Sequence, residues 1–290
     1  MSDMAVSFQN VEKKFGRKQV LRSMNMNVPA GSVYALLGCN GVGKSTSVKM
    51  MVGQLEPNAG EIRVLGRDPV RDGVELRRET GYVAENQRLF NELTLAEYCA
   101  FLKKFYPDWN DEMCSSILRR FKLPADAKLG SFSRGMYSKA ALVGALCRKP
   151  KLLVLDDPTL GLDTAARHEF MDMILETFSD FEHTVLISSH IINELEGLCD
   201  HAGIVRDGKM VLEGDLDSLK RNTSRLVIRK PAKELPPLPG EVKRIPKLDD
   251  LEIVFGGARE PVEKALAENG IANSEIHSLS LEEIFLAYSE

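Results

Sequence analysis

The fold is decided by the stretch Gly38-Cys39-Asn40-Gly41-Val42-Gly43-Lys44-Ser45-Thr46, which fits the phosphate-loop pattern G-x-x-x-x-G-K-[ST]. An apolar run, Val33 to Leu37, comes directly before it, and a helix-compatible run, Ser45 to Val52, follows. A strand, a glycine-rich loop and a helix in this order are the context that the motif requires. A glycine-rich turn that binds nothing is the alternative, and the complete spacing with both flanking elements favours the phosphate site.

The residue types in this loop suit an anion. Gly38, Gly41 and Gly43 can take positive φ, so their backbone N–H groups can converge on a phosphate. The helix that opens at Lys44 adds the partial positive charge of its N-terminus. We expect Lys44 to reach the β- and γ-phosphates of a nucleotide and the Ser45 hydroxyl to ligate Mg²⁺.

Composition is that of a globular protein. The 290 residues are 43% hydrophobic and 28% charged, enough for one or two domains with a sizeable core. No apolar run approaches the roughly 18 residues of a membrane span, and no secretory signal is evident, so we expect a soluble chain in the cytosol. The net charge of −4 argues against nonspecific nucleic-acid binding but leaves room for a local basic patch.

The five cysteines do not form a recognisable metal or disulfide pattern. Their number is odd and no pair has C-x-x-C spacing, which predicts free thiols in a reducing compartment and no zinc site. One of them lies inside the phosphate loop, where a positive field could lower its pKa. A tolerated variable position is favoured there over a redox switch. The cysteines stand at Cys39, Cys99, Cys114, Cys147 and Cys199.

Two further apolar runs end in polar residues. Leu152 to Leu155 leads into Asp156 and Asp157, the Walker B pattern, and its continuous apolar character is typical of a strand in a parallel sheet covered on both faces. Acids at the carboxyl end of such a strand lie where these sheets bind ligands, so Asp156 is expected to hold Mg²⁺ directly or through water. The second run ends at His190. A lone histidine at a strand end is more often structural, but its place at the same sheet edge as Asp156 favours a γ-phosphate contact.

Residues 94–149 carry a helical pattern, and the end of the chain has a different texture. Thr94 with Glu97 predicts a capping box, and Tyr106-Pro107-Asp108-Trp109 should break the helix that follows it. A helix is also expected over Ile191–Asp200, followed by a hairpin around Asp207-Gly208. Residues 221–290 look like a small α+β appendage.

Several motifs, in order, resemble the ATP-binding subunit of ABC transporters. Ser133-Arg134-Gly135-Met136-Tyr137 looks like a variant of the LSGGQ signature, Gly161-Leu162-Asp163 like the D-loop, and His190 like the switch histidine. Phe15 alone suggests an ordinary partly buried aromatic, but it stands where the family has its adenine-stacking ring, which favours stacking. Glu85 stands where the family usually has the Q-loop glutamine. The resemblance covers about residues 4–220.

The resemblance implies a fold and a domain division. The fold is an α/β P-loop NTPase core of ABC type, with a mixed RecA-like sheet, an N-terminal antiparallel β subdomain and a helical signature subdomain. We expect the ATP-binding domain over residues 1–220, with the helical subdomain inserted at about 91–149, and the accessory domain over 221–290. The Tyr106–Trp109 break and the closing segment Ser280–Leu286 resemble ATPases of bacterial exporters whose membrane domain is a separate polypeptide.

The resemblance also implies a mechanism with ATP and Mg²⁺. Two copies, or one copy and a paralogous ATPase, would pair head to tail, each ATP lying between one P-loop and the partner's signature. Closure would drive an integral membrane permease. The chain would be bound to this permease at the inner face of the cell membrane, and no nucleic-acid partner is expected. Catalysis would involve Lys44, Asp157 as the general base and His190, and the metal would be held by Ser45, Asp156 and Glu85. Nucleotide contacts would come from Phe15, Gly38, Asn40, Gly41, Gly43, Lys44, Ser45, Thr46, Ser133, Gly135 and Asp163.

Three residues depart from the family pattern. Asp157 replaces the catalytic glutamate with a carboxylate one methylene shorter, and misplacement of a base by about 1 Å can slow a reaction on the order of 100-fold. Slow hydrolysis with a long-lived ATP-bound dimer is one expectation, and a backbone adjustment that restores reach is the other. Glu85 adds a charge near the metal, where it could ligate Mg²⁺ or face a membrane-subunit helix. Gln87, two residues on, could take the place of the missing Q-loop glutamine. Arg134 and Met136 vary the signature but leave its serine and glycine in place.

Two rival functions remain open. A soluble ATPase of ribosomes or DNA would usually have two tandem ATPase units or a long coiled coil, and this chain has one unit and no heptad run. An ATP-dependent dimerisation switch with little turnover is supported by Asp157 alone. The transported substrate is not encoded in this chain, and the appendage is expected to be a dimer contact or packing, with a regulatory ligand-binding domain as the third possibility.

Overall fold

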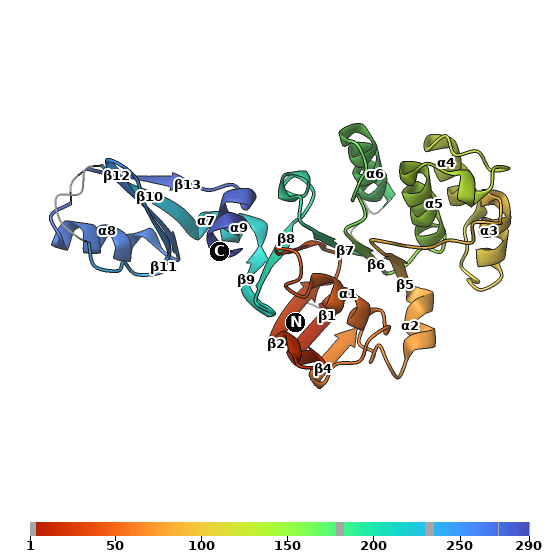
Figure 1. The fold of residues 1–290 in the computed structure, drawn as a ribbon, viewed down its shortest axis with the longest axis horizontal. Coiled ribbons are helices and arrows are strands. Elements are labelled where there is room, and N and C mark those ends of the chain that lie inside the picture. Colours follow the sequence, from red (N-terminus) through yellow and green to blue (C-terminus); the bar gives the residue numbers. More distant parts are fainter. Residues whose placement is uncertain (1–3, 178–182, 230–234, 272, 290) are drawn as a thin grey trace.

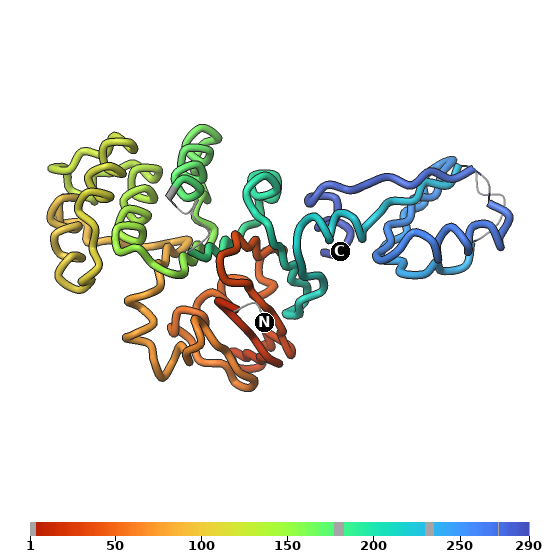
Figure 2. Tube along the Cα trace, turned by 180° about the vertical axis from the view of Figure 1, so that it is seen from behind, coloured from red at the N-terminus to blue at the C-terminus, as the bar shows by residue number. Residues whose placement is uncertain are grey.

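The protein is an elongated molecule built on three sheets (Figure 1). The computed structural model describes residues 4–177, 183–229, 235–271 and 273–289. The helical segment with α3, α4 and α5 lies at one end and the C-terminal sheet at the other, with the main sheet between them, as the reverse view also shows (Figure 2). No helix within these ranges is long and apolar enough to cross a membrane.

The main sheet has six strands in the order β5-β6-β7-β3-β8-β9. All neighbours are parallel except β8 and β9, which form the hairpin expected around Asp207-Gly208. The phosphate loop leaves β3, near the centre, and β6 and β7 run beside it, so the carboxyl ends of these three strands meet at one edge. The strands are β3 (Val33–Leu37), β5 (Thr80–Val83), β6 (Leu152–Asp156), β7 (Thr184–Ser189), β8 (His201–Arg206) and β9 (Lys209–Asp215).

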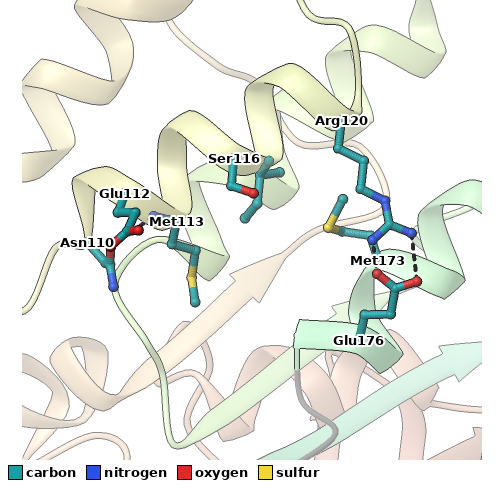
Figure 3. A pocket seen from close by; sticks show the side chains of 8 residues that line it. Asn110, Glu112, Met113, Ser116, Arg120, Met173 and Glu176 are labelled. Carbon is teal, nitrogen blue, oxygen red and sulfur yellow. Dashed lines mark hydrogen bonds and ion pairs between the residues drawn. The ribbon is translucent and has the colours of Figure 1, made fainter.

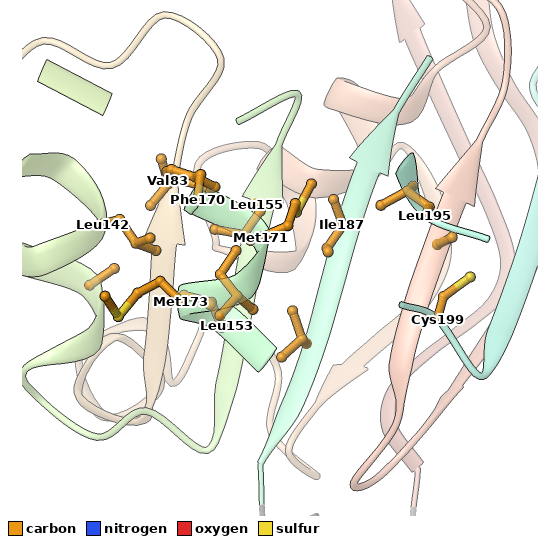
Figure 4. Close-up of a cluster of buried hydrophobic side chains, with 14 of the residues drawn as sticks. Val83, Leu142, Leu153, Leu155, Phe170, Met171, Met173, Ile187, Leu195 and Cys199 are labelled. Atoms are coloured by element: carbon orange, nitrogen blue, oxygen red, sulfur yellow. The ribbon is translucent and has the colours of Figure 1, made fainter. Parts of the chain in front are cut away.

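Both faces of this sheet are covered, as the continuous apolar strand predicts. Leu153 and Leu155 of β6 point into the cluster under α6 (Thr164–Thr177), where Phe170 packs beside them (Figure 4). Leu152 and Val154, on the other face, belong to a second cluster shared with the N-terminal strands. Alternate residues of one strand therefore serve two cores, which is why no polar residue interrupts it before Asp156.

The N-terminal residues form a separate antiparallel sheet in the order β2-β1-β4. This sheet closes the second hydrophobic cluster against α1, the helix of the phosphate loop. The arrangement confirms the predicted N-terminal β subdomain. Its elements are β1 (Met4–Phe15), β2 (Lys18–Pro29), α1 (Lys44–Met51), β4 (Ala59–Val64) and α2 (Gly73–Glu79).

The inserted segment is helical, and its first helix begins where the sequence predicts. Thr94 accepts a hydrogen bond from the Glu97 N–H at 3.2 Å, and the Glu97 carboxylate accepts from the Thr94 N–H at 2.8 Å, a complete capping box. The helices are α3 (Leu95–Lys103), α4 (Asp111–Arg120) and α5 (Arg134–Leu146), with a 3₁₀ turn at Leu129–Ser131. The chain is non-helical between α3 and α4, so the predicted break at Tyr106–Trp109 is confirmed.

Two ion pairs join the helical segment to α6 of the main domain. Arg120 at the end of α4 pairs with Glu176 beside a shallow pocket whose floor includes Met113 (Figure 3). Lys139 of α5 pairs with Glu169, about two helical turns before Glu176 on the same face of α6. The helical segment is thus tied to the helix that directly follows the predicted D-loop.

The C-terminal sheet has four antiparallel strands in the order β11-β12-β10-β13, with α8 packed on one face. The last helix, α9, lies elsewhere. Its residues Leu281, Ile284 and Phe285 are buried in the cluster of the main domain, so α9 packs on that domain. The division at residue 220 stays a prediction, and the contacts of α9 with β8 and with the segment at Ile192–Glu194 cross it. The elements are α7 (Leu216–Arg221), β10 (Thr223–Arg229), β11 (Glu241–Pro246), β12 (Asp250–Gly256), α8 (Arg259–Glu268), β13 (Ser274–Ser278) and α9 (Leu281–Ser289).

The anchoring of α9 can be tested by stability. Ile284→Ala should lower the free energy of unfolding by about 2–5 kcal/mol, because it opens a cavity under a fully buried side chain. Leu286→Ala, two residues on and half exposed, should change it by less than about 0.5 kcal/mol. Chemical denaturation of both variants measures the difference. Equal losses would mean that α9 is not held by its buried face.

One expected element is wrong, and some elements of the structure were not expected from the sequence. The helix expected over Ile191–Asp200 is wrong, because only a 3₁₀ turn forms, at Ile192–Glu194. Ile192, Leu195 and Cys199 are buried there without a continuous series of α-helical hydrogen bonds. The short helix α2 and the strands β11 and β13 were not expected. Their polar, half-exposed sequences show little period-2 or period-3.6 pattern.

Candidate active site

The phosphate loop connects β3 to α1 and has the geometry of an anion cradle. Gly41 and Gly43 have φ of 82° and 117°, a region that other residues rarely adopt. The expectation of positive φ at Gly38 is wrong. Glycine is required there by space, because a Cβ would lie 2.7 Å from the Val42 side chain and 2.8 Å from the Val205 carbonyl oxygen.

Lys44, the first residue of α1, is buried within the loop. Its ammonium group donates hydrogen bonds to the carbonyl oxygens of Gly38 at 2.7 Å and Cys39 at 3.2 Å. Burial lowers the pKa of Lys44, and the nearby carboxylates of Asp157 and Asp156 oppose that shift. The cation is therefore held at the loop by neutral carbonyl groups, which a phosphate can replace.

Asp156 lies at the end of β6 and is almost fully buried. Its Oδ1 accepts hydrogen bonds from the Ser45 hydroxyl at 3.0 Å and the Ser188 hydroxyl at 2.6 Å. Burial raises the pKa of Asp156, while these two hydrogen bonds lower it and the neighbouring Asp157 charge raises it. Ser45 and Asp156, 111 residues apart, are thus brought into direct contact as the two motifs predict.

Asp157 follows in a left-handed conformation with φ of 43°. Its N–H donates to the backbone oxygen of Ser188 at 3.0 Å, which fixes its backbone beside β7. Its Oδ1 lies 2.7 Å from Nδ1 of His190. A carboxylate only accepts, so Nδ1 carries the proton and leaves Nε2 free of this bond. Asp157 and His190 therefore form a hydrogen-bonded pair.

A cavity of about 440 Å³ brings these groups together. It joins the phosphate loop to the carboxyl ends of β6 and β7 and to the Glu85 loop after β5. Two cations and two carboxylates face it. Its lining is Lys18, Val20, Asn40, Gly41, Gly43, Lys44, Ser45, Thr46, Glu85, Asp157, Leu160 and His190.

Five predicted nucleotide contacts do not line this cavity, and Gly38, described above, is one of them. Phe15 is 47% exposed at the end of β1, with the Lys13 ammonium 5.2 Å from the ring centre, so it is not a core aromatic. Ser133 caps α5 by accepting from the Met136 N–H at 3.3 Å, and Gly135 follows in the first turn. Asp163 accepts from the Ala166 N–H at 2.8 Å, at the start of α6. Their roles toward nucleotide stay predictions.

Sequence reasoning missed Ser188. This residue pairs with Asp156 across the β6–β7 register, donates to the Asp156 carboxylate, and its hydroxyl also accepts from the Asp157 N–H at 3.2 Å. One side chain thus positions both acids. The signal in the sequence was a polar residue, Ser188, within the apolar run of a buried strand.

Comparisons with known proteins agree with this geometry. The family model described as ABC transporter matches residues 21–160. The bacitracin transport ATP-binding protein BcrA of Bacillus licheniformis is 32% identical over 218 residues, which is 74% of this chain and 71% of BcrA. The Nod factor export ATP-binding protein I of Burkholderia orbicola is 34% identical over 219 residues, covering 74% of this chain and 72% of its own.

Solved structures give the same result. The structure of an ATP-binding subunit of an ABC transporter superposes with a TM-score of 0.69 at 30% identity, over 75% of this chain and 92% of the other. The fold of a dimeric ATP-binding cassette, MJ0796 bound to ADP and Pi, also matches, with a TM-score of 0.66 at 24% identity over 73% and 98% of the two chains. The chain therefore belongs to the ATP-binding subunits of ABC transporters, ATPases that power transport.

Proposed function

We propose that this chain is the ATP-hydrolysing motor subunit of an export complex, which dimerises on ATP and drives a separate membrane permease. The observation that carries the proposal is the contact between Ser45 and Asp156 at the mouth of the phosphate loop, with Asp157 and His190 on the same cavity. A phosphate cradle, a pair of oxygen ligands and a carboxylate base are the parts that phosphoryl transfer to water requires.

The residues around Asp156 suit a magnesium ion. Mg²⁺ prefers oxygen ligands and usually binds through one or two carboxylates plus phosphate oxygens. Ser45 and Asp156 would hold it, with Glu85 across the cavity as a further ligand. The ion would neutralise charge on the transferring phosphoryl group. Lys44 and the N–H groups of the loop would orient the β- and γ-phosphates, and Asp157, aligned by His190, would accept the proton of the attacking water.

Export is supported by the names of the relatives. They include ATP-binding proteins for bacitracin transport, Nod factor export and lantibiotic transport. These cargoes differ from one another, so we assign direction and not substrate to this chain. The chain would then work at the inner face of the membrane, bound to its permease.

Each nucleotide site would be completed by a second chain. Ser133 and Arg134 are exposed at the N-terminus of α5, outside the Lys44 cavity of the same chain. A helix N-terminus favours an anion. The Ser133 hydroxyl and the Gly135 N–H would therefore contact the γ-phosphate that a partner chain holds. This partner is a second copy of the chain or a paralogous ATPase.

A mixing experiment tests this two-chain site. Lys44→Ala should not bind ATP, and Ser133→Arg should bind it without dimerising. Their mixture contains one intact loop and one intact signature, so it should form heterodimers that retain a single ATP, measured by light scattering and nucleotide content. If Ser133→Arg alone dimerises on ATP as the wild type does, the proposed site is wrong.

An aromatic patch on the helical segment is our candidate for the permease contact. The ring of Phe101 lies 5.2 Å from Phe90 and 5.0 Å from Phe105, centre to centre, and Phe90 and Phe105 are both more than half exposed. Phe90 belongs to the segment that follows Glu85, so a membrane-subunit helix seated here would adjoin the nucleotide cavity. Exposed aromatic clusters of this kind are typical of interfaces.

Phe105→Asp should therefore abolish co-purification of a polytopic membrane subunit, identified by mass spectrometry, from detergent-solubilised membranes. The ATPase rate of the isolated chain should stay within about twofold, since surface changes away from a site rarely matter. Leu248→Asp changes a fully exposed apolar residue in the turn between β11 and β12 and should leave co-purification intact. Recovery of ribosomes in place of a membrane subunit would favour the rival function.

The role of Ser188 gives a further prediction. Ser188→Ala removes the hydrogen bond to Asp156 and should lower the ATPase rate about 10-fold, because an unfixed carboxylate binds metal less well. The Mg²⁺ concentration for half-maximal rate should rise by a similar factor. Ser189→Ala is the control, since the Ser189 hydroxyl bonds to the Ile191 backbone and not to Asp156 or Asp157 within the described part of the chain. Equal Mg²⁺ dependence in both variants would contradict the positioning role.

A further inference from the structure

Two loops leave the carboxyl ends of the neighbouring parallel strands β6 and β7. The base loop, residues 157–163, runs from Asp157 to the start of α6, and the histidine loop, residues 190–194, runs from His190 through the 3₁₀ turn. At their inner ends the loops are joined by the hydrogen bond between Asp157 and His190 at 2.7 Å. A second connection joins the same two loops farther from the sheet, through residues that do not line the nucleotide cavity.

The second connection is the side chain of Arg167, in the first turn of α6. Its Nε–H donates to the carbonyl oxygen of Leu162 in the base loop at 2.9 Å, and its Nη1 donates to Oε1 of Glu194 in the histidine loop at 2.8 Å. The Arg167 backbone N–H also donates to the Asp163 carbonyl oxygen at 3.0 Å. One planar guanidinium therefore holds both loops at once, in the fixed fork geometry that arginine provides.

This connection is sheltered from water. The side chain of Arg167 is 26% exposed and that of Glu194 is 16% exposed. Ion pairs on an open surface contribute little because solvent screens them and both side chains are mobile. The partial burial of this pair, together with the carbonyl bond on the same guanidinium, makes it a firmer restraint than the exposed pair of Arg120 with Glu176.

Both loops are short and stiff enough to carry this restraint to the cavity. In the base loop, the Leu160 N–H donates to the Asp157 carbonyl oxygen at 3.2 Å and the Leu162 N–H donates to the Thr159 carbonyl oxygen at 3.0 Å. Two successive turns thus connect Asp157 with the carbonyl group that Arg167 binds. In the histidine loop, only three residues separate the histidine from the glutamate of the ion pair.

We propose that Arg167 is a positioning residue for ATP hydrolysis, which holds Asp157 and His190 together by tying the base loop to the histidine loop. The inference rests on the proposed function, because it takes Asp157 as the base. A base displaced by about 1 Å can slow a reaction on the order of 100-fold. A link outside the cavity can therefore control the rate without contacting nucleotide or metal.

The first test is steady-state hydrolysis by the full chain. Arg167→Ala should lower kcat by about 10-fold or more and leave the KM for ATP within about twofold, because the phosphate loop is untouched. Glu194→Ala should have the same effect. The double variant should be no slower than the slower single variant, since both changes remove one link and their effects are then not additive.

Arg244→Ala is the matched control. Arg244 of β11 also joins a glutamate and a backbone carbonyl, with hydrogen bonds to Glu241 at 2.6 Å and to the Leu235 carbonyl oxygen at 2.7 Å. Its ion pair is equally sheltered, with side chains 28% and 18% exposed, but it lies in the C-terminal sheet. The kcat of this variant should stay within about twofold of the wild type.

A second measurement does not depend on turnover. Nδ1 of His190 carries the proton that it donates to Asp157, and nitrogen-15 NMR under alkaline conditions distinguishes this tautomer from the one protonated at Nε2. The signals can be assigned with His190→Gln. The wild type and Arg244→Ala should show the Nδ1–H tautomer, and Arg167→Ala should show a mixture of the two.

Wild-type kcat in both Arg167→Ala and Glu194→Ala would overturn the proposal. So would slow variants in which the His190 spectrum is that of the wild type, since the link would then act through something other than the Asp157–His190 pair. Because Glu194→Ala breaks the link from its other end, poor folding of Arg167→Ala does not weaken the test. Failure of the proposed function looks different: Asp157→Asn would then hydrolyse ATP at nearly the wild-type rate.

Discussion

Asp157→Asn should lower the steady-state ATPase rate by about 100-fold or more while ATP binding persists. A general base contributes about 10²–10⁴-fold to such reactions, and an amide cannot accept the proton of the attacking water. The substitution is nearly isosteric. Asparagine tolerates the left-handed conformation found at Asp157, and its amide oxygen can still accept from Nδ1 of His190, so the fold of the site should be kept.

Phosphate release and nucleotide affinity, measured on the same preparation, separate chemistry from binding. We expect an ATP-bound dimer of Asp157→Asn that accumulates because it cannot turn over. Asp172→Asn is a matched control, since it is the same change at an exposed residue of α6 that does not line the cavity. An Asp157→Asn rate within a few fold of the wild type would exclude Asp157 as the base.

The companion variant Asp157→Glu tests the length of the side chain. If the short carboxylate limits reach, glutamate should accelerate hydrolysis by up to about 100-fold, the effect of misplacing a base by about 1 Å. That result would support the slow-switch form of the proposed function. No acceleration would mean that the left-handed backbone at Asp157 already places its carboxylate correctly, and the chain would be an ordinary motor.

The sequence was sufficient for the parts of the site that one strand and its loop define. The phosphate loop, Asp156 and His190 each follow a continuous apolar run, and parallel strands buried on both faces place their carboxyl ends at one edge. Their meeting could therefore be predicted without knowing the strand order. The capping box at Thr94 is equally local, because all of its partners lie within four residues.

What could not be predicted depends on partners that are distant in the chain. Ser188 matters only because the β6–β7 register sets it opposite Asp156. Gly38 is fixed by Val205, more than 160 residues away, and not by its own backbone preference. The helix expected over Ile191–Asp200 is wrong because tertiary burial of Ile192 and Leu195 overrides the local pattern.

The placement of α9 shows the same limit. Its residues Leu281, Ile284 and Phe285 are buried against the main domain, a contact that the helical pattern of this segment does not specify.

The second large effect is expected from Lys44→Ala, which should reduce ATP affinity by about 100-fold or more and make hydrolysis undetectable. Lys44 is the buried cation of the phosphate loop, and it is released to the phosphates only by giving up its bonds to Gly38 and Cys39. A charge-assisted hydrogen bond contributes about 1.5–3 kcal/mol, and two such bonds to the β- and γ-phosphates amount to at least a 100-fold change in affinity.

Lys49→Ala is the matched control, because Lys49 lies on the same helix but is exposed to solvent. Titration calorimetry of both variants with ATP gives the affinities, and circular dichroism checks that α1 is intact. Lys44→Arg adds a stricter comparison: it keeps the charge but carries a larger planar head group into a loop where Gly43 already leaves no room for a Cβ beside Leu21. If Lys44→Arg binds ATP as well as the wild type, charge alone is sufficient. If it fails like Lys44→Ala, the loop demands the shape of lysine, and ATP recognition here depends on close packing of the cradle as much as on its positive charge.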